Sequence, residues 1–244
     1  MTLPKKLPIV ELFGPTLQGE GSQVGLRTMF IRLGYCDGAG ENGWCIWCDS
    51  MFAVDPKNKD KWEWMFPLLI VQALRHISGY CNQVTISGGN PCVHDLFELV
   101  KQLTIGGYSI NVETQGTIYK DWLQGCNTVT VSPKPPSAGS PCNYDRLDIF
   151  MDKLKYKSRT TLTLKIVIDP YDLEDYTFAE QVFSRYPWVT SRYISVLTLP
   201  VDESKVILDR YRYVADRVLN NPQLPDVAVL PQLHVLLWGH QRRM

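Results

Sequence analysis

The sequence predicts an α/β fold with a mainly parallel sheet, arranged as an open or closed β/α barrel in a single domain. Short apolar segments rich in β-branched residues alternate along the chain with segments of helical periodicity. This alternation implies right-handed βαβ crossovers. No linker-like tract of Pro, Gly and Ser divides the 244 residues, because the one loop-rich stretch, Lys134–Pro141, directly follows a predicted strand.

Each strand is predicted where apolar and β-branched residues run together. In chain order the predicted strands are Leu7–Phe13, Thr28–Gly34, Gln83–Ser87, Ser109–Glu113, Thr128–Ser132, Leu162–Ile168, Tyr193–Leu197 and Val227–Leu230. Each helix is predicted where apolar residues recur at helical spacing. In chain order the predicted helices are Leu68–Ile77, Leu96–Leu103, Leu147–Leu154, Asp175–Tyr186 and Ser204–Leu219.

The composition is that of an ordinary globular protein. Apolar residues make up 45% and charged residues 20%, and the formal net charge is zero. The balanced charge gives no general attraction for nucleic acid or for an anionic membrane. No stretch approaches the roughly 20 apolar residues of a membrane-spanning helix, and no signal-type apolar run follows the first residues. Seven cysteines without secretory context favour a reducing, cytoplasmic location and metal chemistry over disulfides.

The most informative pattern is a C-x8-C-x2-C triplet, formed by Cys36, Cys45 and Cys48 on the loop after strand Thr28–Gly34. Three closely spaced thiolates suit a [4Fe–4S] cluster in which one iron keeps an open position. A C-x2-C pair is also half of a zinc site, although the other four cysteines are scattered singly. A thioredoxin-like dithiol has no third cysteine upstream. Taken alone, the triplet leaves a cluster, a zinc ion and a redox or inert role open.

Polar and glycine-containing motifs follow the ends of further predicted strands. They are Ser87-Gly88-Gly89-Asn90-Pro91, Glu113-Thr114-Gln115-Gly116 and Ser132-Pro133-Lys134-Pro135-Pro136. Functional sites of β/α sheets gather at the carboxyl ends of the strands. Each motif alone could be a turn, but their register with the cysteine loop indicates one site. Beside a cluster, the Gly88-Gly89 pair permits the close backbone approach that the amino-acid part of S-adenosylmethionine (SAM) requires.

Two further features indicate a polar small-molecule substrate. Leu17-Gln18-Gly19-Glu20-Gly21 follows the first strand, and it offers donors and acceptors for a heterocycle such as a pterin or purine, or else it is an ordinary loop. Arg32 interrupts an apolar strand, and Arg is rarely buried without a partner. It either pairs with an acid or binds a substrate carboxylate through two hydrogen bonds.

Three side chains have both an ordinary and a functional interpretation. Ser50 could be a helix N-cap or a ligand of Mg²⁺, which prefers oxygen. Lys134 could lie in solvent or be fixed near a carboxylate or an adenosine. His234 belongs to the apolar segment 231–244, which we expect to dock on the body as a C-terminal tail. A lone histidine is more often structural than catalytic.

With these motifs in order, the chain resembles the 7-carboxy-7-deazaguanine synthases, small radical SAM enzymes of the queuosine and deazapurine pathway. The resemblance runs nearly from end to end. It covers Glu11–Gly21, Cys45–Ser50, Val84–Pro91, Glu113–Thr117, Ser132–Pro136, Pro231–His234 and Leu236–Gly239. Several collinear blocks are far more specific than the cysteine triplet alone.

The resemblance implies an abbreviated, partial β/α barrel of the radical SAM type, spanning residues 1–244 as one domain with a cluster loop at 36–48. It implies a carbon–nitrogen lyase that converts 6-carboxy-5,6,7,8-tetrahydropterin to 7-carboxy-7-deazaguanine with ring contraction and loss of ammonia. The cofactors it implies are a [4Fe–4S] cluster, SAM and Mg²⁺, with the radical chemistry carried by the cofactors. The family also suggests a homodimer that receives electrons from a flavodoxin- or ferredoxin-type donor. The long connections Lys57–Trp64 and Pro133–Asn143 fit its reduced helix count.

Site residues carry over by position. Cys36, Cys45 and Cys48 match the cluster ligands, and Ser50 matches the ligand of Mg²⁺. Leu17, Gln18, Gly19, Glu20, Arg32, Ser87 and His234 match the substrate site, whereas Trp47, Cys48, Asp49, Gly89, Ser132, Pro133 and Lys134 match SAM contacts. Arg32, as partner of a substrate carboxylate, and Glu113, as an active-site carboxylate, are the expected catalytic residues.

The chain departs from the family pattern in three places. Most radical SAM enzymes have C-x3-C-x2-C, whereas eight residues, Asp37 to Trp44, separate the first two cysteines here. Asn90 stands where many relatives have Glu. The segment Ser195–Thr198 replaces a Gln-containing SAM contact. These positions put the loop geometry and the contacts with SAM in question, but not the cluster.

Two other classes of function compete with this hypothesis. A radical SAM activase of a glycyl-radical protein would share the cluster and Gly88-Gly89, but it has no evident need for Leu17–Gly21 with Arg32. A non-catalytic metal-binding interaction module predicts a protein without SAM turnover.

Overall fold

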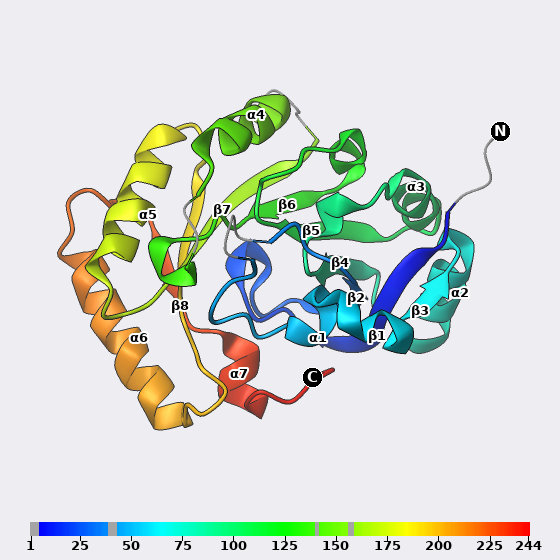
Figure 1. Cartoon of the computed structure of the whole chain (residues 1–244), viewed down its shortest axis with the longest axis horizontal. Helices are drawn as coiled ribbons and strands as arrows, with labels where there is room; N and C mark the ends of the chain where they lie inside the picture. The colour runs from blue at the N-terminus through cyan, green and yellow to red at the C-terminus, as the bar shows by residue number, and fades with distance from the viewer. Residues whose placement is uncertain (1–4, 39–42, 140–141, 156–158) are drawn as a thin grey trace.

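The computed structural model describes residues 5–38, 43–139, 142–155 and 159–244, and its centre is a nine-stranded sheet (Figure 1). The strands are β1 (Leu7–Leu17), β2 (Arg27–Leu33), β3 (Glu63–Met65), β4 (Gln83–Gly88), β5 (Ser109–Thr114), β6 (Thr128–Val131), β7 (Thr161–Ile168), β8 (Ser191–Val196) and β9 (Ala228–Leu230). The α-helices are α1 (Met51–Val54), α2 (Pro67–Ile77), α3 (Phe97–Ile105), α4 (Tyr144–Lys155), α5 (Leu173–Arg185), α6 (Ser204–Leu219) and α7 (Leu233–Trp238).

The predicted α/β class and the mainly parallel sheet are confirmed. The strand order is β3-β1-β2-β4-β5-β6-β7-β8-β9, and every pairing from β2 to β9 is parallel. Only β1 is reversed, since it pairs antiparallel with both β2 and β3. A short loop, residues 18–26, joins β1 to β2, and a connection this short returns the chain beside the strand it leaves.

Every predicted strand and helix is present, with ends that differ by at most a few residues. Three short elements were not predicted, namely β3, α1 and α7. β3 begins near the end of the predicted long connection Lys57–Trp64, and the 3-10 helix Pro56–Lys61 covers the first part of that connection. Elements of three to six residues are too short to show a period of hydrophobicity.

The sheet separates an apolar outer side from a polar inner side. On β2, Met29, Ile31 and Leu33 are fully buried in the core, while Phe30 and Arg32 point the other way and line a cavity. This is the period of two that a strand imposes. Helices α2 to α6 surround the sheet on its outer side (Figure 1), and their buried residues complete the core. No helix in the described ranges is long and apolar enough to cross a membrane.

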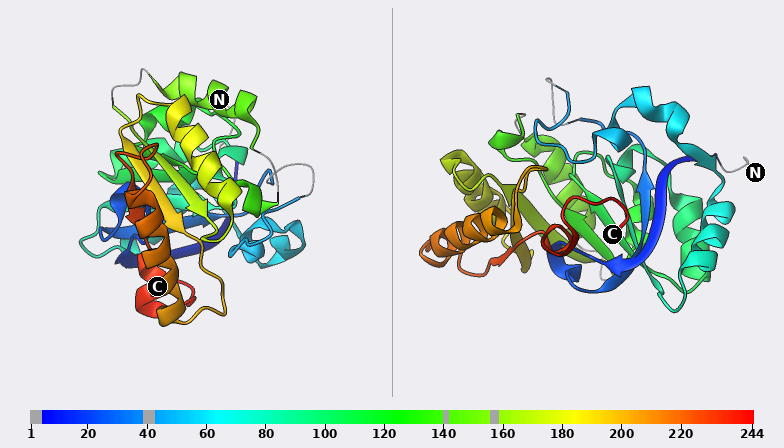
Figure 2. Two further views of the ribbon diagram at one scale, coloured as in Figure 1. Left: turned by 90° about the vertical axis from the view of Figure 1, so that its left-hand side faces the viewer. Right: turned by 90° about the horizontal axis from the view of Figure 1, so that it is seen from below.

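The segment after β9 returns to the beginning of the sheet. The backbone N–H of Leu233 donates to the carbonyl of Gly19 at 3.0 Å, which fixes α7 beside the loop after β1. Beyond α7 the chain runs back toward β1 (Figure 2) and brings Arg242 and Arg243 to Glu11. The last described residues of the chain therefore lie against β1.

Candidate active site

A cavity of about 220 Å³ lies on the inner side of the sheet, at the carboxyl ends of the parallel strands. Most of the residues that the sequence predicts for the site line it, and they come from β1, β2, β4 and β5, from the loops after β1, β2, β4 and β6, and from α7. These residues are Leu17, Gln18, Gly19, Glu20, Arg32, Trp47, Asp49, Ser50, Ser87, Gly89, Glu113, Ser132, Lys134 and His234. The sequence segments that the motif analysis selected thus converge on one cavity, as the meeting of parallel strand ends requires.

Four predicted site residues do not line the cavity itself. Pro133 is buried, although its sequence neighbours Ser132 and Lys134 both line the cavity. Cys36, Cys45 and Cys48 are free thiols, half-buried in the loop that follows β2. Residues 39–42 of the predicted cluster loop lie outside the described residues. The backbone N–H of Cys48 donates to the carbonyl of Cys45 at 3.1 Å, which makes a turn of the C-x2-C pair.

The three thiols share one electrostatic environment. Burial raises the pKa of Cys36 to about 12 and also raises the pKa values of Cys45 and Cys48, whereas the charge of Lys134 lowers all three. Within the described ranges, no three or more His, Cys, Asp or Glu side chains lie close enough together to bind one metal ion jointly. A cluster does not require that arrangement, because each cysteine binds a different iron. Three free thiols around one lysine are a donor set that fits an iron–sulfur cluster better than a single zinc ion.

Glycine is required where β4 ends, because the backbone passes very close to β2. A Cβ atom on Gly88, whose φ is +142°, would lie 2.1 Å from the carbonyl oxygen of Leu33. A Cβ atom on Gly89 would lie 2.0 Å from the carbonyl oxygen of Tyr35 and 2.9 Å from Cβ of Cys36. The predicted glycine pair therefore holds the first cysteine of the triplet against the end of β4.

Asp37 joins the first cysteine to two strand-end motifs. Its Oδ1 accepts from Nδ2 of Asn90 at 2.8 Å and from Nε2 of Gln115 at 2.6 Å, and its Oδ2 accepts from the Thr117 hydroxyl at 2.5 Å. Asn90 also accepts from the Thr114 hydroxyl at 2.8 Å. The Asn90 amide thus binds a carboxylate supplied by the residue after Cys36.

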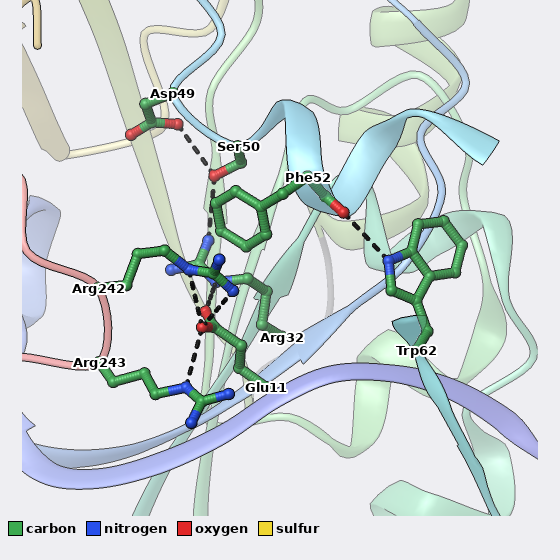
Figure 3. Close-up of polar contacts among 8 residues, drawn as sticks. All are labelled: Glu11, Arg32, Asp49, Ser50, Phe52, Trp62, Arg242 and Arg243. Carbon is green, nitrogen blue, oxygen red and sulfur yellow. Dashed lines mark hydrogen bonds and ion pairs between the residues drawn. The ribbon is translucent and has the colours of Figure 1, made fainter. Parts of the chain in front are cut away.

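Arg32 both pairs with an acid and lines the cavity, so the two interpretations of this residue are not exclusive. Its Nε donates to Oε2 of Glu11 at 3.0 Å, and its Nη1 donates to the hydroxyl of Ser50 at 3.1 Å (Figure 3). Ser50 donates in turn to Oδ1 of Asp49 at 3.0 Å. Ser50 precedes α1, but its side chain makes no N-cap hydrogen bond to that helix.

A buried ion pair forms another part of the wall. Lys165 on β7 donates to Oε2 of Glu20, and Nε2 of Gln232 donates to Oε1 of the same carboxylate. Burial alone would raise the pKa of Glu20, but the positive charges of Lys165 and His234 and these hydrogen bonds lower it to about 2. The attraction of Glu20 and Glu113 outweighs burial for Lys165 and raises its pKa. Both members of the pair are therefore charged at neutral pH.

The loop after β1 is fixed by its own side chains. Nε2 of Gln18 donates to Oε1 of Glu113 at 3.0 Å, and Oε1 of Gln18 accepts from the backbone N–H of Gly19 at 2.7 Å. The His234 ring lies over Gly19 so closely that a Cβ atom there would be 1.8 Å from Nδ1. The loop after β1, the end of β5 and α7 thus form a continuous polar wall.

Ser87, Trp47 and Lys134 are the predicted residues whose contacts remain to be described. The Ser87 hydroxyl lines the cavity, is buried, and has no hydrogen-bond partner within the described ranges. Such groups usually find a partner in a ligand or water. On the other side, the Trp47 ring lies under the Lys134 ammonium, 5.7 Å from it, and Nε1 of Trp47 donates to the Ser137 hydroxyl at 3.2 Å. The cysteine loop is therefore docked on the loop after β6.

The motif analysis missed Glu11, Lys165 and Gln232. Glu11 and Lys165 are charged residues inside the apolar strands β1 and β7, which is the signal that singled out Arg32. The same argument applied to each strand would have found both. Gln232 carried no such signal, because its partners Glu20 and Thr198 come from distant parts of the chain.

The comparisons with known proteins agree with one another. No family model matches the chain. A 7-carboxy-7-deazaguanine synthase of Bacillus cereus is 40% identical over 97% of this chain and 98% of its own length. The solved structure of QueE from Escherichia coli superimposes with a TM-score of 0.67 at 25% identity and covers 94% of this chain and 95% of that chain. Streptococcus suis SuiB bound to S-adenosylmethionine shares the fold alone, with a TM-score of 0.53 at 13% identity over 83% of this chain and 50% of SuiB.

Proposed function

Because the chain belongs to the 7-carboxy-7-deazaguanine synthase family, we propose that its cavity binds 6-carboxy-5,6,7,8-tetrahydropterin and converts it to 7-carboxy-7-deazaguanine and ammonia. The chain is a radical SAM enzyme, a lyase of deazapurine biosynthesis with a partial barrel fold. The competing interpretation as a non-catalytic metal-binding module has no support in these relatives. An activase of a glycyl-radical protein would have little use for a cavity of this polarity.

The distribution of charge around the cavity is the observation that carries this proposal. Arg32 lies on β2, and its guanidinium contacts Ser50, the residue before α1; the two would form a site for a carboxylate. Glu113 lies on β5, and Lys165 on β7 pairs with Glu20 from the loop after β1. In the sheet, β4, β5 and β6 separate β2 from β7. Carboxylates accept hydrogen bonds from adjacent N–H groups, such as those of a 2-aminopyrimidinone ring. A carboxylated pterin has these two complementary ends.

The residues present fit a [4Fe–4S] cluster and SAM. Cys36, Cys45 and Cys48 would hold the cluster, and the backbone of Gly88 and Gly89, which line the cavity beside the first cysteine, would face the amino-acid part of SAM. Trp47, Asp49, Ser132 and Lys134 line the same side of the cavity and would bind the rest of SAM, beside Pro133. When bound, these groups supply the electron and the hydrogen-abstracting radical.

The contribution of the protein is orientation and charge. Arg32 would hold the substrate carboxylate, while Glu20 and Glu113 would accept from its ring N–H groups. Leu17, Gln18 and Gly19 shape the loop that carries Glu20, and the Ser87 hydroxyl is available to a ligand in the cavity. Lys165, Gln232 and His234 keep Glu20 ionised at neutral pH. The chain thereby fixes one orientation of the pterin and excludes water from the reacting carbon.

Further parts of the proposal rest on the family resemblance. Ser50 would bind Mg²⁺ through the hydroxyl that contacts Arg32 and Asp49. The protein would act as a homodimer in the cytoplasm, with a flavodoxin- or ferredoxin-type donor that supplies electrons. The free thiols of the described cysteines are consistent with a reducing compartment.

An anaerobic turnover assay tests the proposed reaction. Cluster-reconstituted protein is mixed with SAM, dithionite, Mg²⁺ and 6-carboxytetrahydropterin, and the products are identified by mass spectrometry. We expect 7-carboxy-7-deazaguanine from the wild type and none from Cys48→Ala. Formation of 5′-deoxyadenosine without that product would keep the radical SAM chemistry and reject the substrate. Absence of both would reject the proposed function.

A further inference from the structure

Glu11 is a buried carboxylate that contacts three guanidinium groups. Its side chain is 1% exposed. Oε2 accepts from Nε of Arg32 at 3.0 Å, and Oε1 accepts from Arg242 at 2.7 and 3.0 Å and from Nε of Arg243 at 3.1 Å (Figure 3). The carboxylate lies on β1, opposite Arg32 in the register of β1 and β2. One negative charge thus organises three positive charges beside the cavity.

The contact with Glu11 determines which edge of Arg32 is available to a ligand. Nε donates to Glu11 and Nη1 donates to Ser50, while the side chain as a whole lines the cavity and is 21% exposed. A guanidinium held at Nε presents its remaining N–H groups in a fixed plane, which suits a planar carboxylate. The orientation of Arg32 therefore depends on a residue that does not itself line the cavity.

The same carboxylate holds the segment 239–244, here called the arm. Arg242 and Arg243 are 53% and 62% exposed, so the protein surface alone does not confine them. The Arg242 guanidinium stacks on the Phe52 ring at 3.8 Å, and Met244 at the end of the arm lines the cavity. The contacts of both arginines with Glu11 place Met244 in the wall.

We propose that Glu11 is a positioning residue of the substrate site, which orients Arg32 toward the substrate carboxylate and holds the arm as a wall of the cavity. The proposal rests on the proposed function, since it assumes a carboxylated ligand. Removal of the Glu11 charge has two opposed effects. The loss of a negative charge would by itself strengthen the attraction of the arginines for an anionic ligand. The loss of the contact that orients Arg32 would weaken the binding of that ligand. If Glu11 is a positioning residue, the loss of orientation must outweigh the gain in attraction. Without the Glu11 carboxylate, the three guanidinium groups repel one another and have no common partner.

Equilibrium binding of two ligands that differ by one carboxylate separates these effects. Cluster-loaded protein with SAM is titrated with the product, 7-carboxy-7-deazaguanine, and with 7-deazaguanine, which lacks the carboxylate. We expect Glu11→Gln to reduce the preference for the carboxylated ligand at least about tenfold, the scale of one oriented charge-assisted hydrogen bond. Arg242→Ala/Arg243→Ala leaves the pair of Arg32 with Glu11 intact. It should weaken both ligands alike and keep the preference.

Two controls complete the experiment. Arg185→Ala removes another arginine–carboxylate pair, with Asp148, that lies outside the cavity and should change neither ligand. An unchanged or increased preference in Glu11→Gln would overturn the positioning role. If that variant does not fold, unchanged binding in the double arginine variant would overturn the role of the arm, and with it the proposal as stated. If the wild type binds neither ligand, the proposed function itself fails.

Discussion

Lys165 and Glu20 form an ion pair inside the cavity wall, with side chains only 6% and 13% exposed. A buried charge whose partner is removed costs about 3–5 kcal/mol. Lys165→Met should therefore lower the free energy of unfolding by several kcal/mol at pH 7, and Lys165→Met/Glu20→Gln should recover part of the loss. Chemical denaturation of the wild type and both variants measures this. An equal loss in the single and double variants would show that Lys165 stabilises the fold by packing alone.

The same pair predicts a dependence on pH. The pKa of Glu20 falls from 4.5 to about 2 in the folded protein, so its pairing stabilises the wild type fully above pH 4.5. This contribution disappears as the pH falls from 4.5 toward 2. In Lys165→Met, burial without the lysine raises the pKa of Glu20. Protonation of Glu20 at low pH then removes the cost of an unpaired buried charge in this variant. The stability difference between the two proteins should shrink in this range, and a constant difference would contradict it.

Arg32→Ala should raise the KM for the pterin substrate at least about tenfold, because an oriented charge-assisted hydrogen bond contributes roughly 1.5–3 kcal/mol. Steady-state kinetics at saturating SAM measures the change. The KM for SAM serves as the internal control, since Arg32 lies on the substrate side of our proposal. An unchanged KM for the pterin would remove Arg32 from the substrate site.

Replacement of any cysteine of the triplet should abolish both cluster binding and turnover. Cys36→Ala, Cys45→Ala and Cys48→Ala are compared by iron and sulfide content and by product formation. Cys142→Ala is the matched control, because Cys142 is also a free, half-buried thiol but belongs to no motif. Cluster content that falls equally in the control would argue for loss of folding instead of loss of a ligand.

Gly19→Ala should disturb α7, since its Cβ atom would meet Nδ1 of His234 at 1.8 Å. Overpacking of this kind costs about 1–3 kcal/mol. We expect a lower free energy of unfolding and a higher KM for the pterin. In the His234→Ala background, the same substitution should cost much less. Equal costs in both backgrounds would mean that the ring moves aside freely.

Ser50→Ala distinguishes a Mg²⁺ ligand from a partner of Arg32. If the hydroxyl binds the ion, the Mg²⁺ concentration for half-maximal activity rises about tenfold and saturating Mg²⁺ restores most turnover. If the hydroxyl only steadies Arg32, the KM for the pterin rises and the Mg²⁺ dependence stays as in the wild type. A titration of Mg²⁺ at several substrate concentrations separates the two.

The fold was predictable from local pattern because most of its elements are long enough to show a period. Helix α6 begins and ends at the predicted residues, Ser204 and Leu219. β3, α1 and α7 have three, four and six residues, and tertiary contacts decide whether such short segments form. The reversal of β1 follows from its short loop to β2, which the strand prediction did not use.

The site was predictable where it depends on strand ends, and less so where it depends on long-range pairs. Parallel strands bring Ser87, Glu113 and Ser132 to one edge whatever the loops do. Sequence could not tell whether Arg32 pairs with an acid or faces a ligand, and the structure shows that it does both. The link between Glu20 and Gln232 spans 212 positions, so no local pattern contains it.

The contact between β1 and the arm has a consequence for how the protein is made. Glu11 and Arg242 are separated by 231 positions, so the ribosome synthesises the carboxylate long before its partner. A pairing at this sequence separation forms slowly relative to local structure. The cavity thus acquires the part of its wall formed by Met244 only after the whole sheet has been translated. A chain stalled shortly before Arg242 would contain the cysteine loop and most of the cavity wall. Its Glu11 would contact Arg32 but would lack the contacts with Arg242 and Arg243.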